Sequence, residues 1–458
     1  MRLRRILRAV LAGVSLAASA VVGGCSTAPA AAPAPAPLTD AERELNARSF
    51  DAMWQTVKDR HWDPTLGGLD WEAVKVELRP RVEQAETMQE ARAAMREALA
   101  RLKQSHFGII DRDVYEDVAQ PGAESGDPVR AAESIVETGG DPGFDLRVVD
   151  KQAIVVRVDP GSGADRAGIK PGWVLTSVKG APIAPLIDRL TEQFNGQEAG
   201  ETMIVRGVQS RLAGPVGATI AATFLDGQDQ ESEKSIELEV PAGDLTKFGN
   251  LPAVYVDFTS TRLTGNIGYL RFNYFLDPGR LMPKFSAAME SFMQCDGVII
   301  DLRGNPGGIG FMANGMSGFF VDKDGLKLGE MTTRDTTLNF VIYPRLEVYQ
   351  GPLAILVDGL SVSTSEIMAG GLQDIGRVRV FGTRTAGAAL PSTIERLPNG
   401  DGFQFVVANY VSASGRVLEG EGVIPDQEVA VDRATLLAGK DPVIEAAVEW
   451  IREQSRGE

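Results

Sequence analysis

A serine and a glutamate three residues apart stand where a buried strand meets a helix. Residues 353–357 are apolar, Asp358-Gly359 ends this predicted strand, and a helix is predicted to begin near Ser363. A hydroxyl at the carboxyl end of a strand and the start of a helix occupies the usual place of a nucleophile in an open sheet. Ser363 and Glu366 also form a helix-capping box, which needs no catalysis to explain it. Alone, this segment is compatible with a nucleophile or with a simple cap.

A glycine-rich turn follows an earlier apolar strand. Residues 297–308 read GVIIDLRGNPGG, and the turn ends in Gly307 and Gly308. Because glycine has no Cβ, backbone N–H groups in such a turn can approach a ligand closely and stabilise an oxyanion. Glycine turns after strands are common, so this segment too is weak evidence by itself.

Two histidines and two cysteines are present in the chain. Because histidines and cysteines are so few, the sequence argues against a multi-histidine metal centre, a cysteine-based zinc site and a disulfide framework. An imidazole can take a proton from a serine hydroxyl and return it to a leaving amine. His106 follows Ser105 in the sequence LKQSHFGII, whereas His61 has no comparable neighbours and is interpreted as structural. For His106 alone, a loop or core histidine is the simpler interpretation.

Three blocks must position these side chains. Residues 38–115 have apolar side chains at helical spacing, after capping boxes such as Thr39 with Glu42. Residues 140–242 change to a period near two, which favours short strands and turns. Residues 250–458 alternate strands with helices, and this order predicts an α/β core with a mostly parallel sheet.

The beginning of the chain has the pattern of an export signal, residues 1–24. Four arginines up to Arg8 precede an apolar stretch, rich in alanine and glycine, that is too short for a spanning helix. Residues 25–37 are rich in alanine and proline, a composition typical of an extended, semi-rigid tether. The net charge of the whole chain is -16, which argues against nucleic acid as a partner.

The end of this leader, Val22-Gly23-Gly24-Cys25, resembles the lipobox of bacterial lipoproteins. The resemblance implies that Cys25 is diacylated and anchors an exported chain to a membrane of the cell envelope. Ser26 resembles the sorting pattern for the outer membrane in some bacteria. The alternative is an ordinary secretory signal with a chance cysteine.

Residues 140–242 resemble a PDZ domain of the bacterial protease type, on the segment PGSGADRAGIKPGWVL at 160–175. Family members usually carry Asp at the position of Trp173. PDZ domains hold a peptide C-terminus by strand addition beside a Gly-aromatic loop, and the peptide-binding candidate here is Gly143-Phe144. The alternative is another small β-rich insert.

Taken together, the serine and glycine segments resemble the core of the tail-specific (carboxyl-terminal processing) serine protease family, over residues 50–426. The resemblance implies an α/β fold with a crotonase/ClpP-like catalytic core, an N-terminal helical domain and an inserted PDZ-like domain. By matching position, Ser363 is the nucleophile. The N–H of Thr364 and the Gly307-Gly308 turn would then form the oxyanion hole.

One departure separates the chain from the better-known branch of that family, which uses a lysine base in a GxxTxGK segment. Here residues 382–388 read GTRTAGA, with Ala388 at the lysine position, and an arginine cannot serve as base because it stays protonated. The chain instead resembles the tricorn-like branch, which has a Ser-His pair, matching Ser105-His106, and a glutamate in EGxGVxPD. That glutamate matches Glu419, with Glu421 as an alternative register.

The resemblance implies a serine peptidase that needs no metal or cofactor. It would hydrolyse polypeptides, entering by their C-termini, through a Ser363 acyl-enzyme with His106 as general base, oriented by Glu419 or Ser105. An ordinary imidazole base would lose activity below about pH 6–7. The alternatives are a catalytically silent, peptide-binding scaffold lipoprotein and a hydrolase of a non-peptide ester or amide.

Overall fold

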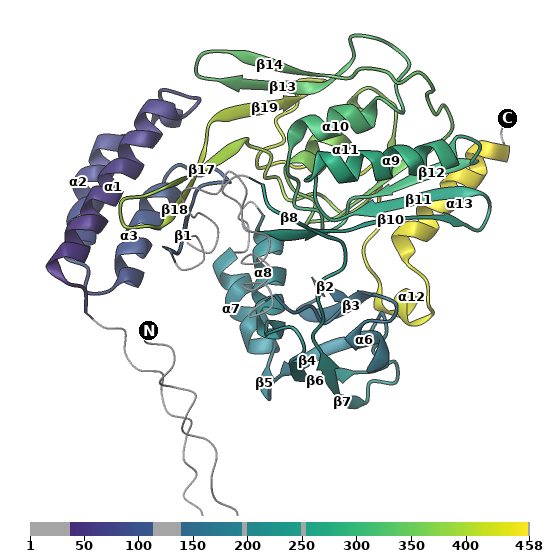
Figure 1. The fold of residues 1–458 in the computed structure, drawn as a ribbon, viewed down its shortest axis with the longest axis horizontal. Helices are drawn as coiled ribbons and strands as arrows, with labels where there is room; N and C mark the ends of the chain where they lie inside the picture. Colours follow the sequence, from purple (N-terminus) through teal and green to yellow (C-terminus); the bar gives the residue numbers. More distant parts are fainter. Residues whose placement is uncertain (1–36, 113–138, 195–198, 249–252, 457–458) are drawn as a thin grey trace, which may run out of the picture. The chain divides into compact units, whose positions relative to one another are not determined.

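The computed structural model describes residues 37–112, 139–194, 199–248 and 253–456 (Figure 1). The predicted signal segment 1–24, Cys25 and nearly all of the 25–37 tether lie outside these residues. Helices and strands are mixed, as the sequence predicts. Within the described ranges, no helix has both the length and the apolar character that a membrane span requires.

The helical block, residues 38–112, packs three amphipathic helices together. They are α1 (Asp40–Arg60), α2 (Trp71–Glu83) and α3 (Met88–Ala100). The side chains of Thr39 and Thr87 accept hydrogen bonds from the first turns of α1 and α3, as their capping sequences predict. The apolar faces of the helices surround Leu397, Phe403 and Phe405, which belong to a hairpin near the end of the chain. The helical block is therefore completed by residues that lie about 300 positions later in the sequence.

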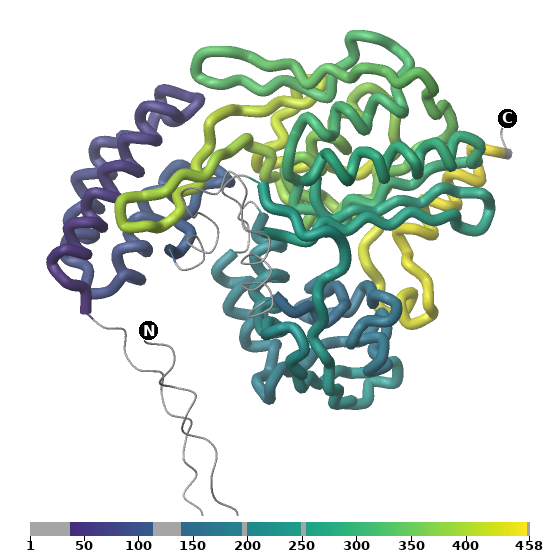
Figure 2. The backbone as a smooth tube through the Cα atoms, viewed as in Figure 1, coloured from purple at the N-terminus to yellow at the C-terminus, as the bar shows by residue number. Residues whose placement is uncertain are grey.

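This hairpin consists of β17 (Ser392–Arg396) and β18 (Gly402–Val406), and it lies beside the helices (Figure 2). β1 (Gly108–Ile110), which directly follows the helical block, pairs antiparallel with β18, with Gly108 opposite Gln404. The guanidinium of Arg92 forms an ion pair of 2.6 Å with Asp401, whose side chain is fully buried. Both α3 and β1 are thus attached to this hairpin.

The inserted block, residues 139–246, is built on a five-stranded sheet in the order β2-β3-β4-β6-β7. Its strands are β2 (Phe144–Val149), β3 (Gln152–Val158), β4 (Val174–Val178), β6 (Thr219–Leu225) and β7 (Glu231–Glu237), with the short β5 (Ala181–Pro182) beside β4. Its helices are α6 (Gly163–Arg166), α7 (Ala184–Phe194) and α8 (Gly200–Gln209). The sheet and helices enclose a separate apolar core, and β2 lies at one edge of the sheet.

The C-terminal block, residues 253–456, contains a six-stranded sheet in the order β10-β11-β12-β15-β16-β20. The strands are β10 (Phe258–Leu263), β11 (Ile267–Phe272), β12 (Gly297–Asp301), β15 (Leu353–Val357), β16 (Arg379–Gly382) and β20 (Gln427–Glu428). Only the pair β10–β11 is antiparallel among these six strands. The prediction of a mostly parallel α/β sheet is therefore confirmed for this block.

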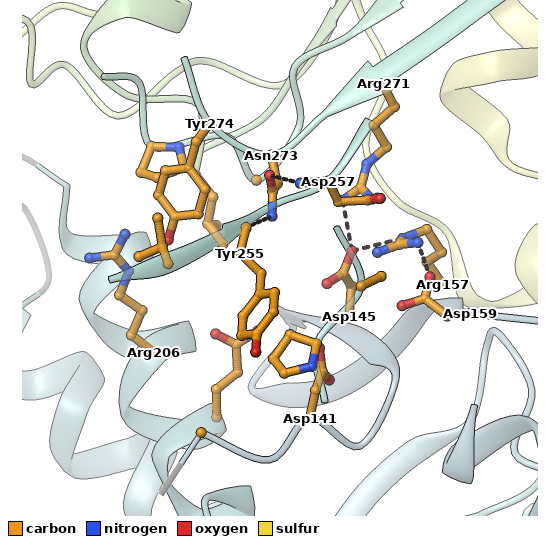
Figure 3. A pocket seen from close by; sticks show the side chains of 18 of the residues that line it. Asp141, Asp145, Arg157, Asp159, Arg206, Tyr255, Asp257, Arg271, Asn273 and Tyr274 are labelled. Carbon is orange, nitrogen blue, oxygen red and sulfur yellow. Dashed lines mark hydrogen bonds and ion pairs between the residues drawn. The ribbon is translucent and has the colours of Figure 1, made fainter. Parts of the chain in front are cut away.

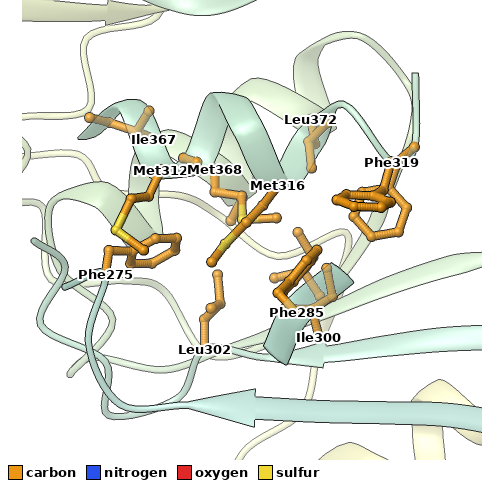
Figure 4. Packing of buried hydrophobic residues seen from close by; sticks show 14 of the residues in the cluster. Phe275, Phe285, Ile300, Leu302, Met312, Met316, Phe319, Ile367, Met368 and Leu372 are labelled. Carbon is orange, nitrogen blue, oxygen red and sulfur yellow. The ribbon is translucent and has the colours of Figure 1, made fainter. Parts of the chain in front are cut away.

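Helices cover both faces of this sheet, which explains why β12 and β15 are buried along their whole length. One face packs against α9 (Pro278–Phe292), α10 (Gly310–Ser317) and α11 (Thr364–Asp374), and the other against α13 (Pro442–Arg456). Figure 4 shows Met312 and Met316 of α10 with Met368 of α11 over Ile300 and Leu302. This packing fixes the start of α11 relative to the end of β12.

A second sheet in the same block has the order β14-β13-β19, formed by β13 (Lys327–Thr333), β14 (Thr337–Val341) and β19 (Ala408–Ser412). A short pair, β8 (Asp244–Thr246) with β9 (Val254–Val256), leads from the inserted block into the C-terminal block. Helix α12 (Arg433–Leu437) returns to the inserted block, where Leu436 packs against Ile154 and Val174. The inserted block is therefore contacted by two segments, one that precedes the six-stranded sheet in the sequence and one that follows it.

Candidate active site

Ser363 lies in the turn from β15 to α11 and has an unusual backbone for a residue other than glycine. Its φ of 56° and ψ of -113° fall outside the conformations that L-residues prefer, which costs about 1–3 kcal/mol. The Ser363 N–H is shared between a Glu366 carboxylate oxygen at 2.9 Å and the Ala388 carbonyl at 3.0 Å. These contacts hold the serine at the first turn of α11, as the sequence predicts.

Glu366 has a larger role than the helix cap that the sequence suggests. Its side chain is fully buried. Besides the Ser363 N–H, it accepts hydrogen bonds from the Thr385 hydroxyl at 2.6 Å, from Gly387 N–H at 2.8 Å and from Ala388 N–H at 3.1 Å. Burial raises the pKa of Glu366 to about 7, although these hydrogen bonds act in the opposite direction. Glu366 thus fastens the serine turn to the loop at 385–388.

The glycine turn after β12 lies directly against Ser363. A Cβ on Gly307 would come within 2.8 Å of the Thr364 nitrogen and 2.9 Å of the Ser363 Cβ, so only glycine allows this approach. The Gly307 N–H already donates to the Asn305 side chain at 2.9 Å. Neither the Gly308 N–H nor the Thr364 N–H has an acceptor among the described residues. Within the predicted oxyanion hole, the two open donors therefore belong to Gly308 and Thr364, while Gly307 provides space.

Ser105, His106 and Glu419 form a continuous relay of hydrogen bonds. The Ser105 hydroxyl lies 2.7 Å from Nδ1 of His106 and 2.9 Å from Oε2 of Glu419, and the Ser105 N–H donates to Oε1 of Glu419 at 2.6 Å. A carboxylate only accepts, so the single hydroxyl proton of Ser105 points to Glu419. The Nδ1–H of His106 then donates to Ser105, which leaves the lone pair on Nε2. This is the tautomer that a general base requires.

The two candidates for orienting the imidazole lie in series, because Ser105 contacts the His106 ring and Glu419 contacts Ser105. Glu421, the alternative register, is exposed, and its carbonyl accepts from the Arg384 side chain. His106 itself has a positive φ of 61°, so both residues of the expected nucleophile–base pair have strained backbones.

Burial lowers the pKa of His106 to about 4, because desolvation disfavours the imidazolium. The expectation of an ordinary imidazole that protonates below pH 6–7 is therefore wrong for this environment. The neutral, proton-accepting form persists well into the acidic range.

Ala388 and Ala389 join the two halves of the site. The Ala388 carbonyl accepts from the Ser363 N–H, and the next residue, Ala389, donates its N–H to Oε2 of Glu419 at 3.1 Å. Among the described residues, no hydrogen bond links the Ser363 hydroxyl to the His106 ring. Such bonds often tighten only when substrate binds. Ala388 stands where the lysine-dependent branch of the family has its base. It thus lies next to Ser363 but offers only backbone groups.

The remaining candidates lie outside this constellation. His61 is buried, with Nδ1 near the Asp63 backbone and Nε2 2.8 Å from the Gln104 side chain, in keeping with a structural role. Gly143 and Phe144 lie in the inserted block, where the Gly143 N–H donates to the Asp141 carboxylate at 2.7 Å. Phe144 is buried in the core of that block.

Residues 266–429 match the model of peptidase family S41, and residues 43–100 match the tricorn protease C1 domain. The matched α/β region contains both Ser363 and Glu419. Over residues 266–429 the chain is therefore similar to S41 peptidases. The match to the tricorn C1 domain covers most of the helical block and ends at residue 100, just before Ser105-His106.

Curated relatives of this chain include a probable CtpA-like serine protease of Staphylococcus haemolyticus, 25% identical over 295 residues, which are 63% of this chain and 52% of the relative. A putative tricorn protease homolog 2 of Streptomyces coelicolor is 25% identical over 425 residues, which are 89% of this chain and 32% of the relative. The chain thus spans about half of the length of the first relative and a third of the second.

Two solved structures share the fold of this chain. The photosystem II D1 C-terminal processing protease aligns with a TM-score of 0.53 at 20% identity, covering 86% of this chain and 94% of that one. Mature CPAF aligns with a TM-score of 0.58 at 14% identity, covering 91% and 97%. At these identities the likeness supports the fold alone.

Proposed function

We propose that this protein is a serine peptidase of the cell envelope that cleaves polypeptides through an acyl-enzyme on Ser363, with His106 as general base. The observation that carries the proposal is the relay from Glu419 through Ser105 to His106. This relay leaves the Nε2 lone pair of His106 free. Backbone hydrogen bonds of Ala388 and Ala389 connect the relay to Ser363, whose backbone is strained. The S41 match supports peptidase chemistry at this site.

The geometry supports the following sequence of steps. Nε2 of His106 takes the proton of the Ser363 hydroxyl as the Ser363 oxygen attacks the peptide carbonyl carbon. The N–H groups of Gly308 and Thr364 donate to the resulting oxyanion. The imidazolium, stabilised through Ser105 by the Glu419 charge, then protonates the leaving amine as the C–N bond breaks. Water, deprotonated by the same Nε2, attacks the ester, and the proton returns to the Ser363 oxygen as the acid product leaves.

Further parts of the proposal depend on the resemblances found in the sequence. They are a crotonase/ClpP-like core, a PDZ-like inserted block that receives substrate C-termini near Gly143-Phe144, and export with a lipid anchor at Cys25, with the outer membrane as one possible location. The edge position of β2 favours strand addition in the inserted block. Mass spectrometry of the N-terminal peptide from the envelope fraction tests the lipid, which should be absent from a Cys25→Ser variant.

Replacement of the nucleophile tests the enzymatic part. Ser363→Ala should reduce peptide hydrolysis by several orders of magnitude without changing the fold, while Ser414→Ala, at an exposed serine, should not. A fluorophosphonate probe should label Ser363 in the wild type and fail to label the Ala variant. A folded wild type that neither hydrolyses peptides nor reacts with the probe would instead be a peptide-binding scaffold. Probe labelling with hydrolysis only of small esters or amides would point to a non-peptide substrate.

A further inference from the structure

Two of the cavities in the described chain differ in the character of their walls. One, of about 390 Å³, lies where the inserted block meets the C-terminal block and has a mostly polar lining (Figure 3). There, Arg157 and Arg271 share the Asp145 carboxylate at 3.0 and 2.9 Å. The other, of about 520 Å³, lies between α10 and residues 339–345, and is called the α10 pocket. Arg345 is the only charged residue among the described residues that line it. Its volume is in the range of ligand sites.

One wall of the α10 pocket is an aromatic ring that is exposed but fixed in place. Phe311, in the first turn of α10, is 56% exposed. Its ring stacks on that of Phe340 in β14, with a centroid distance of 4.9 Å and an angle of 12° between the planes. Phe340 is buried and meets Tyr410 edge to face at 5.6 Å. Because the core supports one side of the Phe311 ring, the ring can bind an apolar group with little further loss of freedom.

The opposite wall is fastened to the other end of α10. Tyr343 there is 75% exposed. Two residues later, the Arg345 N–H donates to the Gly318 carbonyl at 2.8 Å, and the Arg345 side chain donates to the Gly315 carbonyl at 3.3 Å. The guanidinium lies 5.0 Å from the centre of the Phe319 ring. The pocket is therefore preformed, with an exposed aromatic side chain on each side.

A buried amide with an open acceptor also lines the α10 pocket. Asn314 is only 8% exposed, and its Nδ2 donates to the Val341 carbonyl at 2.8 Å. Because a carbonyl only accepts, this bond fixes the orientation of the amide. The Asn314 Oδ1 accepts no hydrogen bond from any described residue. Buried polar atoms without a partner are rare, and one at a cavity indicates that a donor from a ligand or from water completes the site.

The α10 pocket lies close to one of the predicted oxyanion donors. Gly308 precedes Phe311 by three residues, and its carbonyl accepts from the Thr364 hydroxyl at 3.0 Å. Three residues span at most about 11 Å, and an extended peptide advances about 3.3 Å per residue. A side chain that contacts Phe311 would therefore belong to a residue within about three positions of the bond that Ser363 attacks.

We propose that the α10 pocket is a specificity site that receives a large apolar side chain, aromatic by preference, of the polypeptide substrate. The proposal rests on the proposed peptidase function and names the kind of residue that stands near the cleaved bond. A basic side chain would meet Arg345, and an acidic one would lose water among aromatic rings. A small side chain would leave the faces of Phe311 and Tyr343 in water, whereas an aromatic ring can pack against both.

Hydrolysis of internally quenched peptides tests the choice of residue. Peptides of one polar sequence carry Phe, Ala, Lys or Glu at a single position, and mass spectrometry locates the cleaved bond. The Phe peptide should have a kcat/KM about 10- to 100-fold above that of the Ala peptide, the range expected for burial of an aromatic side chain. Phe311→Ala should reduce this preference about tenfold, with little change for the Ala peptide. Phe311→Tyr should retain most of the preference.

The matched control is Phe248→Ala, the same change at a phenylalanine that is 47% exposed and does not line the α10 pocket. It should keep the preference of the parent. Tyr343→Ala changes the opposite wall and should act like Phe311→Ala. A preference that survives in both pocket variants would overturn the proposal. A higher kcat/KM for the Lys or Glu peptide than for the Phe peptide would overturn it as well.

Binding separates this proposal from the peptidase function. In the Ser363→Ala chain, fluorescence anisotropy gives the Kd of fluorescein-labelled Phe and Ala peptides without cleavage. Tighter binding of the Phe peptide that Phe311→Ala abolishes, with no hydrolysis by the chain with Ser363 intact, would support the pocket and reject the peptidase. Hydrolysis that needs Ser363 but is indifferent to Phe311 and Tyr343 would do the reverse. A dimer in analytical ultracentrifugation that Phe311→Ala dissociates would assign the pocket to a second copy of this chain and overturn the proposal.

Discussion

Glu366→Gln is the most informative change near the serine, because it keeps the side-chain shape and removes one acceptor oxygen. The carboxylate accepts from four donors, two at each oxygen. If the amide nitrogen of the new glutamine takes the place of Oε1, the Thr385 hydroxyl can rotate and accept a hydrogen bond from it. The Gly387 N–H, however, then faces another N–H donor. The opposite orientation leaves both Ser363 N–H and Ala388 N–H without Glu366 as acceptor. Either way, at least one buried N–H loses its partner.

The magnitude follows from these contacts. A charge-assisted hydrogen bond contributes about 1.5–3 kcal/mol, and an unpaired buried donor costs about 1–3 kcal/mol. The sum, about 2.5–6 kcal/mol, is comparable with or larger than the ~1–3 kcal/mol of backbone strain at Ser363. The strained serine turn should therefore relax in a large fraction of molecules. We expect kcat to fall about 10- to 100-fold, with a smaller change in KM.

The assay is hydrolysis of a fluorogenic peptide as a function of pH. A protonated Glu366 cannot accept from all four donors, so wild-type activity should fall as pH drops through about 7. In the Gln variant this step disappears, and the remaining activity should persist until His106 protonates near pH 4. Glu449→Gln, at an exposed glutamate, is the control. Wild-type kcat and an unchanged pH profile in Glu366→Gln would refute the positioning role.

Three further changes test other contacts. Ser105→Ala removes the acceptor of the His106 Nδ1–H and should lower kcat by about 10²–10⁴ with KM nearly unchanged, since the ring loses its required tautomer; an unaltered kcat would contradict the relay. Phe405→Ala, at a fully buried ring of β18 that packs into the core of the helical block, should lower the free energy of unfolding in urea by about 3–5 kcal/mol, and a loss under 1 kcal/mol, roughly that of a surface change, would argue against this packing. Asp358→Asn leaves Arg147 buried without its ion pair, so thermal unfolding should show a loss of about 3–5 kcal/mol; an unchanged melting temperature would show that the contact is dispensable.

Local pattern was enough to predict several features of this protein. A run of apolar residues ending in Asp358-Gly359 predicts a buried strand, and the Ser363–Glu366 spacing predicts the start of a helix, because both depend on neighbours within a few positions. Helical spacing after Thr39 likewise predicts the first helix. The motifs around Ser105-His106 and Glu419 were recognised by resemblance, which names residues without their contacts.

The contacts themselves were decided by the tertiary structure. Ser105 and Glu419 are 314 positions apart, and they meet because β1 pairs in one register with β18, whose hairpin completes the helical core. Burial, which depends on every packed element, sets the pKa of His106 and of Glu366. The close approach of Gly307 to the Thr364 nitrogen likewise results from packing between distant segments. Propensity acts over a few residues, whereas hydrogen-bond partners and solvent exposure depend on the whole fold.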